Sequence, residues 1–283
     1  MDPELSSGES TRCQVELLDF AVLSQDTVKE YACKSAKKSC NLDPLPASLM
    51  KNCLDALLPT ITNIVNLPLL TGTMPETLKM AGLVPALRKH DANHEQFSNF
   101  CPIPNFVMVL KVIEKAVSAQ LTDHVRTHHL EEWFQSAYKI HDSTESALGE
   151  VRNDILQAID DNRSVLLLLL DLSAAFDTVD LSSLLLHLRT RFGVIGSALA
   201  WFESYLATSK YYAQAEGYKS SLRSLDSGVP QGSVLGPLLY VLYTSPVADI
   251  IESHDLQYHF YADDTQLYIT FKTDSADDTC LAK

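Results

Sequence analysis

The sequence predicts an α+β fold in which an antiparallel sheet is covered on one face by helices. Two observations carry this prediction. Several segments place apolar residues at spacings of three and four, as in amphipathic helices, whereas others are short apolar or aromatic runs separated by turn residues. Helices and hairpins mixed along one chain are typical of this class. With 283 residues, 46% of them hydrophobic, the chain can build one large core or two small ones.

The first half of the chain is expected to be mainly helical. After a polar leader, residues 1–40, with a helix near residues 25–34, apolar residues at helical spacing continue to residue 64, and Gly72 and Pro75 end the pattern. A short strand is expected at residues 83–87 and a polar loop at residues 90–104. Helices follow at residues 106–125 and 142–160, and the second has a capping sequence at residues 142–145. Residues 41–160 thus form one predicted region.

The second half, residues 161–283, alternates strands and helices. A buried strand is predicted at residues 164–171, around the apolar run at residues 165–170. Helices are predicted at residues 180–191 and 196–206, a hairpin at 211–225 and a helix at 231–251 after an opening turn. A last hairpin spans residues 256–271, with its turn at residues 262–264.

Composition limits the classes of function. The net charge of −14 argues against strong autonomous binding to nucleic acid, which usually needs basic patches. The longest apolar run has six residues, far fewer than the roughly 20 that cross a bilayer, so no membrane partner is expected. The start lacks a secretory signal, and the six cysteines form no C-x-x-C pair. We expect free thiols and an intracellular protein of the nucleus or cytoplasm.

Three carboxylates stand out. Asp171 ends the apolar strand, where a charge is costly unless it is paired or binds a metal; the alternative is an ordinary helix cap. Asp263 and Asp264 are adjacent in the turn of an aromatic hairpin, where each raises the pKa of the other unless a cation is near; the alternative is a plain turn. One carboxylate from a strand end and two from a nearby turn can hold two Mg²⁺ ions about 3.5–4 Å apart, and Mn²⁺ can substitute.

A glycine- and proline-rich segment lies between them, GVPQGSVLGPLLY, at residues 228–240. Gly232 lets the backbone approach a ligand closely, and a helix follows the turn. The amide of Gln231 could contact a sugar or a template backbone. The alternative is a simple loop-to-helix junction.

These motifs together resemble the reverse transcriptases of LINE-type (non-LTR) retrotransposons. The resemblance rests on LLDLSAAFDTVD around Asp171, on GVPQGSVLGPLLY and on YADDTQLYITF, in the family's order, and on FQSAYKIHDSTESAL upstream. It spans residues 17–283. It implies a right-hand polymerase: a fingers-side region at 41–160 and a palm at 161–283, with residues 184–228 an excursion toward the fingers. The chain ends soon after the last hairpin, so we expect no thumb.

The resemblance also implies roles for individual residues. Asp171, Asp263 and Asp264 would be the catalytic metal ligands, and the backbone carbonyl of Leu172 would help to hold the nucleotide's metal. Phe176 would exclude a ribose 2′-hydroxyl. The remaining predicted contacts to nucleotide or template are Gln231, Gly232, Arg88 and Lys89. The family's fingers arginine is replaced by Cys101, and a neutral thiol cannot clamp a triphosphate as a guanidinium does.

We therefore predict an RNA-directed DNA polymerase that uses two-metal nucleotidyl transfer, impaired in this copy. Its partners would be an RNA template with a DNA primer, deoxynucleoside triphosphates, and a partner chain supplying thumb or endonuclease functions. One alternative is a catalytically silent retrotransposon remnant or binding module. A second, an RNA-directed RNA polymerase, is disfavoured by Phe176, by the Pro-Gln-Gly turn and by Ala262 before the aspartate pair.

Overall fold

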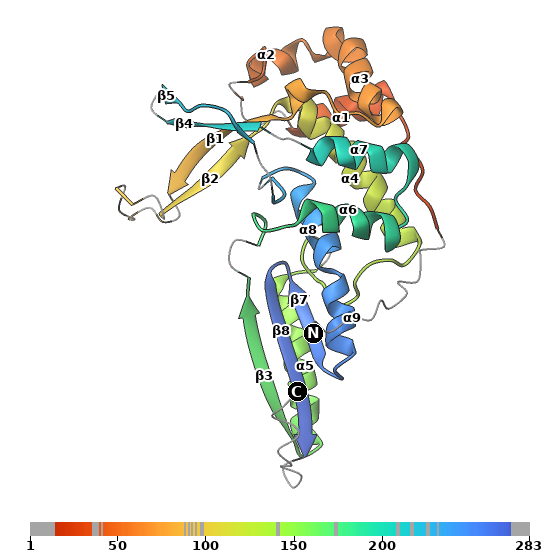
Figure 1. Cartoon of the computed structure of the whole chain (residues 1–283), viewed down its shortest axis with the longest axis vertical. Helices are drawn as coiled ribbons and strands as arrows, with labels where there is room; N and C mark the ends of the chain where they lie inside the picture. The colour runs from red at the N-terminus through yellow and green to blue at the C-terminus, as the bar shows by residue number, and fades with distance from the viewer. Residues whose placement is uncertain are drawn as a thin grey trace, which may run out of the picture. The chain divides into compact units, whose positions relative to one another are not determined.

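A computed structural model describes most of the chain. The described residues are 15–35, 40, 42–87, 89, 91, 93, 95–96, 99–139, 142–172, 175–207, 210–215, 218–224, 227–230 and 232–272. The chain divides into two compact units (Figure 1). Unit 1 comprises residues 1–130 and 179–236, and unit 2 comprises residues 131–178 and 237–283. The predicted domain ranges stay a prediction.

Helices make up much of unit 1. They are α1 (Gln25–Ser35), α2 (Ala47–Asn52), α3 (Leu54–Thr71), α4 (Met108–Thr127), α6 (Leu181–Thr190) and α7 (Gly196–Leu206). Helices α1, α3 and α4 pack on one another, and α7 contacts both α3 and α6. Trp201 and Phe202 of α7 are completely buried in this core. Helix α3 ends at Gly72, whose φ of 65° is left-handed, and a Cβ there would lie 2.7 Å from the Ser197 carbonyl oxygen, so only glycine fits.

Helix α3 is the one described helix long and apolar enough to cross a membrane, judged by length and composition alone. A core helix of a soluble protein passes the same test. Here Val65 and Leu69 are buried against neighbouring parts of the structure, and α3 packs against α1, α4 and α7. The expected absence of a membrane partner stays a prediction.

Unit 1 also contains a sheet of β1 (Met80–Leu87), β2 (Phe100–Asn105), β4 (Lys210–Ala215), β5 (Tyr218–Lys219) and β6 (Arg223–Ser224), preceded by the short 3₁₀ helix η1 (Glu76–Leu78). The order is β2-β1-β4-β5, and β6 pairs with β4. Strand β1 runs antiparallel to β2 and parallel to β4. The predicted loop at residues 90–104 is therefore wrong at its end, where β2 forms. Pro102 and Pro104 are compatible with β2 because it is an edge strand, which tolerates missing N–H donors.

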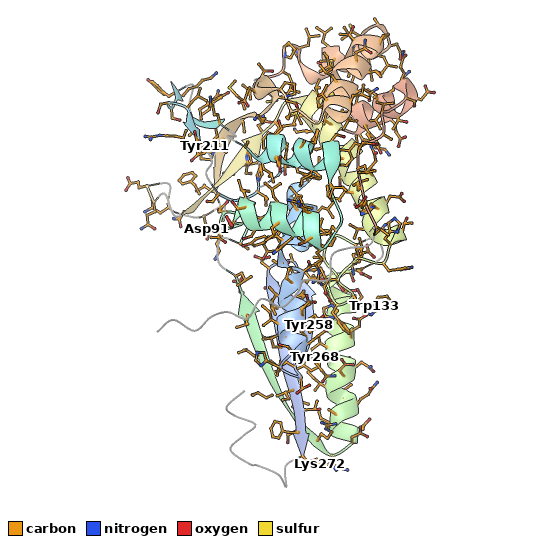
Figure 2. The ribbon with its side chains drawn as sticks, turned by 45° about the vertical axis from the view of Figure 1, so that its right-hand side comes forward. Asp91, Trp133, Tyr211, Tyr258, Tyr268 and Lys272 are labelled. Carbon is orange, nitrogen blue, oxygen red and sulfur yellow. The ribbon has the colours of Figure 1, made fainter. Side chains whose placement is uncertain are left out.

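Unit 2 is built on a three-stranded antiparallel sheet with the order β3-β8-β7. Its strands are β3 (Arg163–Asp171), β7 (Gln257–Tyr261) and β8 (Asp264–Lys272), and α5 (Thr144–Asp160) contacts both β3 and β7. The cap predicted within residues 142–145 is Ser143, which forms a capping box with Ser146. Tyr258 and Phe260 form a core cluster with Ala248 and Ile251 of α9 (Pro246–Glu252). The labels of Tyr258 and Tyr268 in Figure 2 mark the hairpin of β7 and β8.

Two predictions for unit 2 need correction. The single helix predicted at residues 231–251 is two, α8 (Gly236–Thr244) and α9, because Pro246 has no N–H and begins a new helix. The strand predicted to be buried, β3, is largely exposed, and Leu169 has 68% of its surface accessible. Edge position alone does not explain this, because β7 is the other edge strand and is largely buried. Strand β7 is covered by both α5 and α9, whereas β3 packs mainly on β8 and α5, so its apolar run gains less cover.

Candidate active site

The sheet of unit 2 brings the three predicted carboxylates to one end. In the antiparallel ladder of β3 and β8, Asp171 is directly opposite Asp264. Directly opposite residues have Cα atoms about 4.5–5.5 Å apart and side chains on the same face. Asp263 precedes Asp264, and consecutive Cα atoms are about 3.8 Å apart, so all three Cα atoms lie within about 10 Å. Residues far apart in the sequence are thus neighbours.

The turn that carries Asp263 has an unusual backbone. Tyr261 pairs with Asp264, which leaves Ala262 and Asp263 as the two central residues of a tight hairpin turn. Ala262 has a φ of 57°, the left-handed region that normally requires glycine. A positive φ at the first central position alone is the pattern of a type II′ turn. Holding an alanine there costs on the order of 1–2 kcal/mol, so surrounding contacts must maintain this conformation.

The carboxylates suit a hard divalent cation in chemistry and in backbone position. Mg²⁺ and Mn²⁺ prefer carboxylate oxygens, and three Asp side chains supply them. As the side chains stand, however, no three His, Cys, Asp or Glu residues of the described chain converge closely enough to hold a metal ion. The carboxylates of Asp171, Asp263 and Asp264 would have to turn toward one another to share one.

The charge of Asp263 influences two tyrosines, Tyr138 and Tyr240. Burial, and then the charge of Asp263, raise the pKa of Tyr138, and the same causes raise the pKa of Tyr240 to about 12. Both phenols therefore stay protonated at neutral pH. The buried hydroxyl of Tyr240 has no hydrogen-bond partner among the described residues. Phe176, half-buried, stacks on the Tyr240 ring with 4.8 Å between centroids and 24° between planes. Phe176 thus packs against Tyr240, whose pKa is raised in part by the charge of Asp263.

A short segment at residues 134–136 runs beside β7 and holds the turn from outside the sheet. The amide of Phe260 donates to the carbonyl of Phe134 (2.8 Å), and the amide of Ser136 donates to the carbonyl of Phe260 (3.0 Å). Between them, the buried side-chain oxygen Oε1 of Gln135 accepts from the amides of Ala262 (3.0 Å) and Ala137 (2.9 Å). Gln135 thereby contacts the strained residue of the turn.

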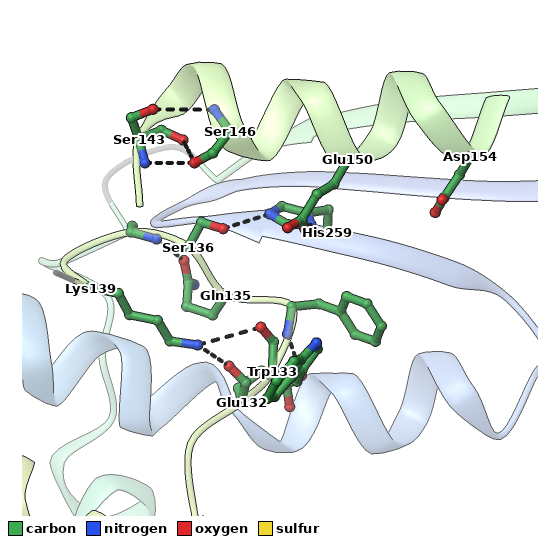
Figure 3. A network of polar contacts seen from close by, with 12 residues as sticks. Glu132, Trp133, Gln135, Ser136, Lys139, Ser143, Ser146, Glu150, Asp154 and His259 are labelled. Carbon is green, nitrogen blue, oxygen red and sulfur yellow. Dashed lines mark hydrogen bonds and ion pairs between the residues drawn. The ribbon is translucent and has the colours of Figure 1, made fainter. Parts of the chain in front are cut away.

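The same segment has further anchors, drawn in Figure 3. Ser136 Oγ lies 2.9 Å from Nε2 of the buried His259, and Nδ1 of this ring lies 3.4 Å from a carboxylate oxygen of Glu150 on α5. Burial lowers the pKa of His259, which favours the neutral ring at pH 7. On the other side, Nζ of Lys139 donates to the carbonyl of Glu132 (2.6 Å). Residues 134–136 are thus fixed on β7, whose His259 lies beside Glu150 of α5.

The glycine-rich loop predicted to bind nucleotide lies in unit 1. Gly232 is exposed with a φ of 79°, and a Cβ there would meet atoms of Pro104 only at 3.8 Å or beyond, so strain rather than space requires glycine. Ser233 closes the turn, since its amide donates to the Pro230 carbonyl (3.2 Å) and its Oγ accepts from the Gly236 amide (2.8 Å). The turn therefore has a defined conformation.

Glu114 of α4 anchors this loop. Its side chain is completely buried. The carboxylate accepts one hydrogen bond from the amide of Val234 through Oε2 (2.8 Å) and one from the hydroxyl of Tyr205 through Oε1 (2.6 Å). Burial raises the pKa of Glu114 to about 7, and the two hydrogen bonds lower it only in part. One titratable side chain thus connects α4, α7 and the loop.

For the other predicted site residues, the structure gives positions in the fold but no contact that bears on their predicted roles. Leu172 is exposed directly after β3, and Lys89 is exposed after β1. Cys101 lies in β2 with Ala86 of β1 as its ladder partner. Arg88 and Gln231 lie outside the described residues, so their predicted contacts stay predictions.

Sequence reasoning missed Gln135 and Glu114. Gln135 belongs to the motif FQSAYKIHDSTESAL. The similarity of this motif to the family was the available signal, but it indicated no role for Gln135. Glu114 lies in the middle of the helical face that α4 buries, and a charged residue at a core position of an amphipathic helix was a signal that could have been used.

Comparisons with known proteins show the family of the chain. Residues 87–282 match the family model described as "Reverse transcriptase (RNA-dependent DNA polymerase)". The chain is 26% identical over 263 residues to "RNA-directed DNA polymerase from mobile element jockey" of Drosophila melanogaster, covering 90% of this chain and 28% of that protein. It is 25% identical over 240 residues to "Probable RNA-directed DNA polymerase from transposon BS" of the same species, covering 83% of this chain and 26% of that protein. The chain therefore spans little more than a quarter of the length of these relatives.

Proposed function

The chain belongs to the reverse transcriptase (RNA-dependent DNA polymerase) family, and from this premise we propose that it is the fingers and palm portion of a LINE-type RNA-directed DNA polymerase. It would extend a DNA primer on an RNA template with deoxynucleoside triphosphates. One observation carries the proposal: the ladder of β3 and β8 sets Asp171 opposite Asp264, and Asp263 lies in the adjoining turn.

The proposed chemistry assigns each residue a task. Divalent ions bound by Asp171, Asp263 and Asp264 would supply Lewis acidity to the primer 3′-hydroxyl and neutralise charge on the triphosphate. By holding these ions in place, the carboxylates would keep the attacking and leaving oxygens in line, and much of the rate acceleration would come from this positioning. Phe176, supported by Tyr240, would lie beside the sugar and favour deoxynucleotides. In unit 1, the loop around Gly232 would contact the incoming nucleotide or template.

The direct test is primer extension on poly(rA)/oligo(dT) with the purified chain, in Mg²⁺ and separately in Mn²⁺. We expect extension that Asp263→Asn abolishes. Asp160→Asn is the matched control, because it removes one charge from the exposed end of α5 in the same unit and should leave extension unchanged. Absence of extension by the parent chain in both ions would favour the silent remnant or binding module. Equal extension by Asp263→Asn would refute the metal-site assignment.

A further inference from the structure

We infer that Gln135 is a positioning residue that fixes the Asp263 turn, so that the FQSAYK segment contributes directly to the geometry of the carboxylate site. This inference rests on the proposed function and deepens it, because it assigns a role to a residue outside the polymerase's carboxylate set. The distinguishing feature is that one side-chain oxygen contacts the backbone of the turn itself.

The backbone of Ala262 is strained. A tight turn with an alanine at a φ of 57° has a conformation that an L-residue seldom adopts unaided. In a freely fluctuating hairpin, Ala262 would spend much of its time in other conformations, and each would point Asp263 in a different direction. A fixed carboxylate at position 263 therefore requires a contact that selects the left-handed state.

The side chain of Gln135 makes a hydrogen bond with the backbone of Ala262. The amide of Ala262 donates to Oε1 of Gln135 at 3.0 Å, and this amide belongs to the strained residue. The same oxygen accepts from the Ala137 amide at 2.9 Å, so the acceptor is itself held in place. Gln135 is only 2% exposed, and water therefore competes little for these bonds. A buried acceptor with two donors is the arrangement that a rigid support requires.

Gln135 is itself held in place by its neighbours in the chain. Backbone bonds on both sides, Phe260 to Phe134 and Ser136 to Phe260, fix residue 135 against β7. Ser136 is tied to His259 (Figure 3). The neighbouring side chains of Ser136 and Gln135 thus contact different partners. The hydroxyl of Ser136 contacts His259, and the amide oxygen of Gln135 contacts the turn. This difference provides a matched control.

The primary test is hydrogen exchange of the Ala262 amide in the full 283-residue chain. Gln135→Met keeps the side-chain length but removes the acceptor oxygen, and we expect exchange at Ala262 to become about tenfold faster. Ser136→Ala removes the contact with His259 but no bond to the turn, and the backbone bonds that hold residue 135 remain, so exchange at Ala262 should change far less than in Gln135→Met. If Gln135→Met lowers the helical circular dichroism, Gln135→Asn replaces it, because its amide is one methylene too short to reach both donors. Unchanged exchange at Ala262 in the folded variant overturns the inference.

A second measurement separates positioning from mere stability. Mn²⁺ binding, followed by electron paramagnetic resonance, should weaken roughly tenfold in Gln135→Met, as expected when a supporting contact of a ligand is lost. In the extension assay kcat should fall while KM for the nucleotide changes little. Adding Ala262→Gly should restore much of both, because glycine adopts a positive φ without strain. Failure of the glycine to restore Mn²⁺ binding would contradict the role in positioning.

These arms distinguish the inference from the proposed function. If the parent chain does not extend primers, the exchange and Mn²⁺ measurements still decide whether Gln135 holds the turn and its ligands. If the parent chain extends primers but Ala262 exchange and Mn²⁺ affinity ignore Gln135→Met, the polymerase assignment stands and the positioning role is wrong.

Discussion

Replacing Glu114 by Gln should make the stability of unit 1 less dependent on pH. The buried carboxylate accepts hydrogen bonds from Tyr205 and Val234, and these bonds and the charge of Lys111 favour its ionised form. A glutamine has nearly the same shape. Its oxygen can accept from the Val234 amide while its NH₂ donates to the Tyr205 oxygen, so the variant keeps both contacts without a titratable group.

The magnitude follows from the raised pKa. Folding moves the pKa of Glu114 from 4.5 to about 7, so the folded state binds more protons between these values. The resulting stabilisation is complete below pH 4.5 and is lost as pH rises through about 7. Each unit of pKa shift corresponds to about 1.36 kcal/mol, so the contribution changes by on the order of 2–3 kcal/mol between pH 5 and pH 8. Glu114→Gln should lose this dependence.

Trp201 provides the assay. It is completely buried in unit 1 and stacks on Tyr205, whereas Trp133, the second of the two tryptophans, is 84% exposed. In a Trp133→Phe background, urea unfolding followed by fluorescence therefore reports the surroundings of Glu114. The difference in unfolding free energy between Glu114→Gln and its parent should grow in favour of the variant from pH 5 to pH 8. A difference that stays constant would refute the raised pKa.

Glu114→Ala is the control for this experiment. It removes the acceptor of both donors and leaves them buried, so it should destabilise the chain by several kcal/mol at pH 5, where the parent gains most from a protonated Glu114. A loss of similar size in Glu114→Gln at pH 5 would show that the glutamine does not replace the hydrogen bonds.

Two further predictions concern nucleotide selection. Phe176→Ala should raise incorporation of ribonucleotides relative to deoxynucleotides, because the ring stacked on Tyr240 would no longer crowd the 2′ position; unchanged selectivity in single-nucleotide extension would leave Phe176 a packing residue. Cys101→Arg should raise extension roughly tenfold or more, since charge-assisted bonds to a triphosphate contribute about 1.5–3 kcal/mol. The assay uses a covalently tethered primer–template, and no gain there would contradict the clamp assignment.

The sequence predicted the elements of the fold better than their environment. The cap at Ser143, the helix that it begins and the hairpin around Asp263 depend on local residue types, and local patterns carry that information. Burial of β3 could not be read in the same way. A run of leucines indicates a strand, but whether it is buried depends on which other elements pack on the faces of the sheet, and here α9 packs on β7 at the opposite edge. The β2 strand was hidden by its prolines, which an edge position tolerates.

In the candidate site as well, some residues could be predicted from local sequence patterns and others could not. Asp171, Asp263 and Asp264 could be singled out in the sequence because they stand in two motifs that resemble those of reverse transcriptases. Gln135 acts through a single oxygen on a backbone amide 127 positions away, and any turn residue at position 262 would present the same amide. Glu114 likewise contacts a backbone amide in the loop, 120 positions away. Since such contacts leave no requirement on the side chain of the partner, no pair of residue types in the sequence could reveal them. They follow only from a structure, and they set the directions in which the recognisable residues point.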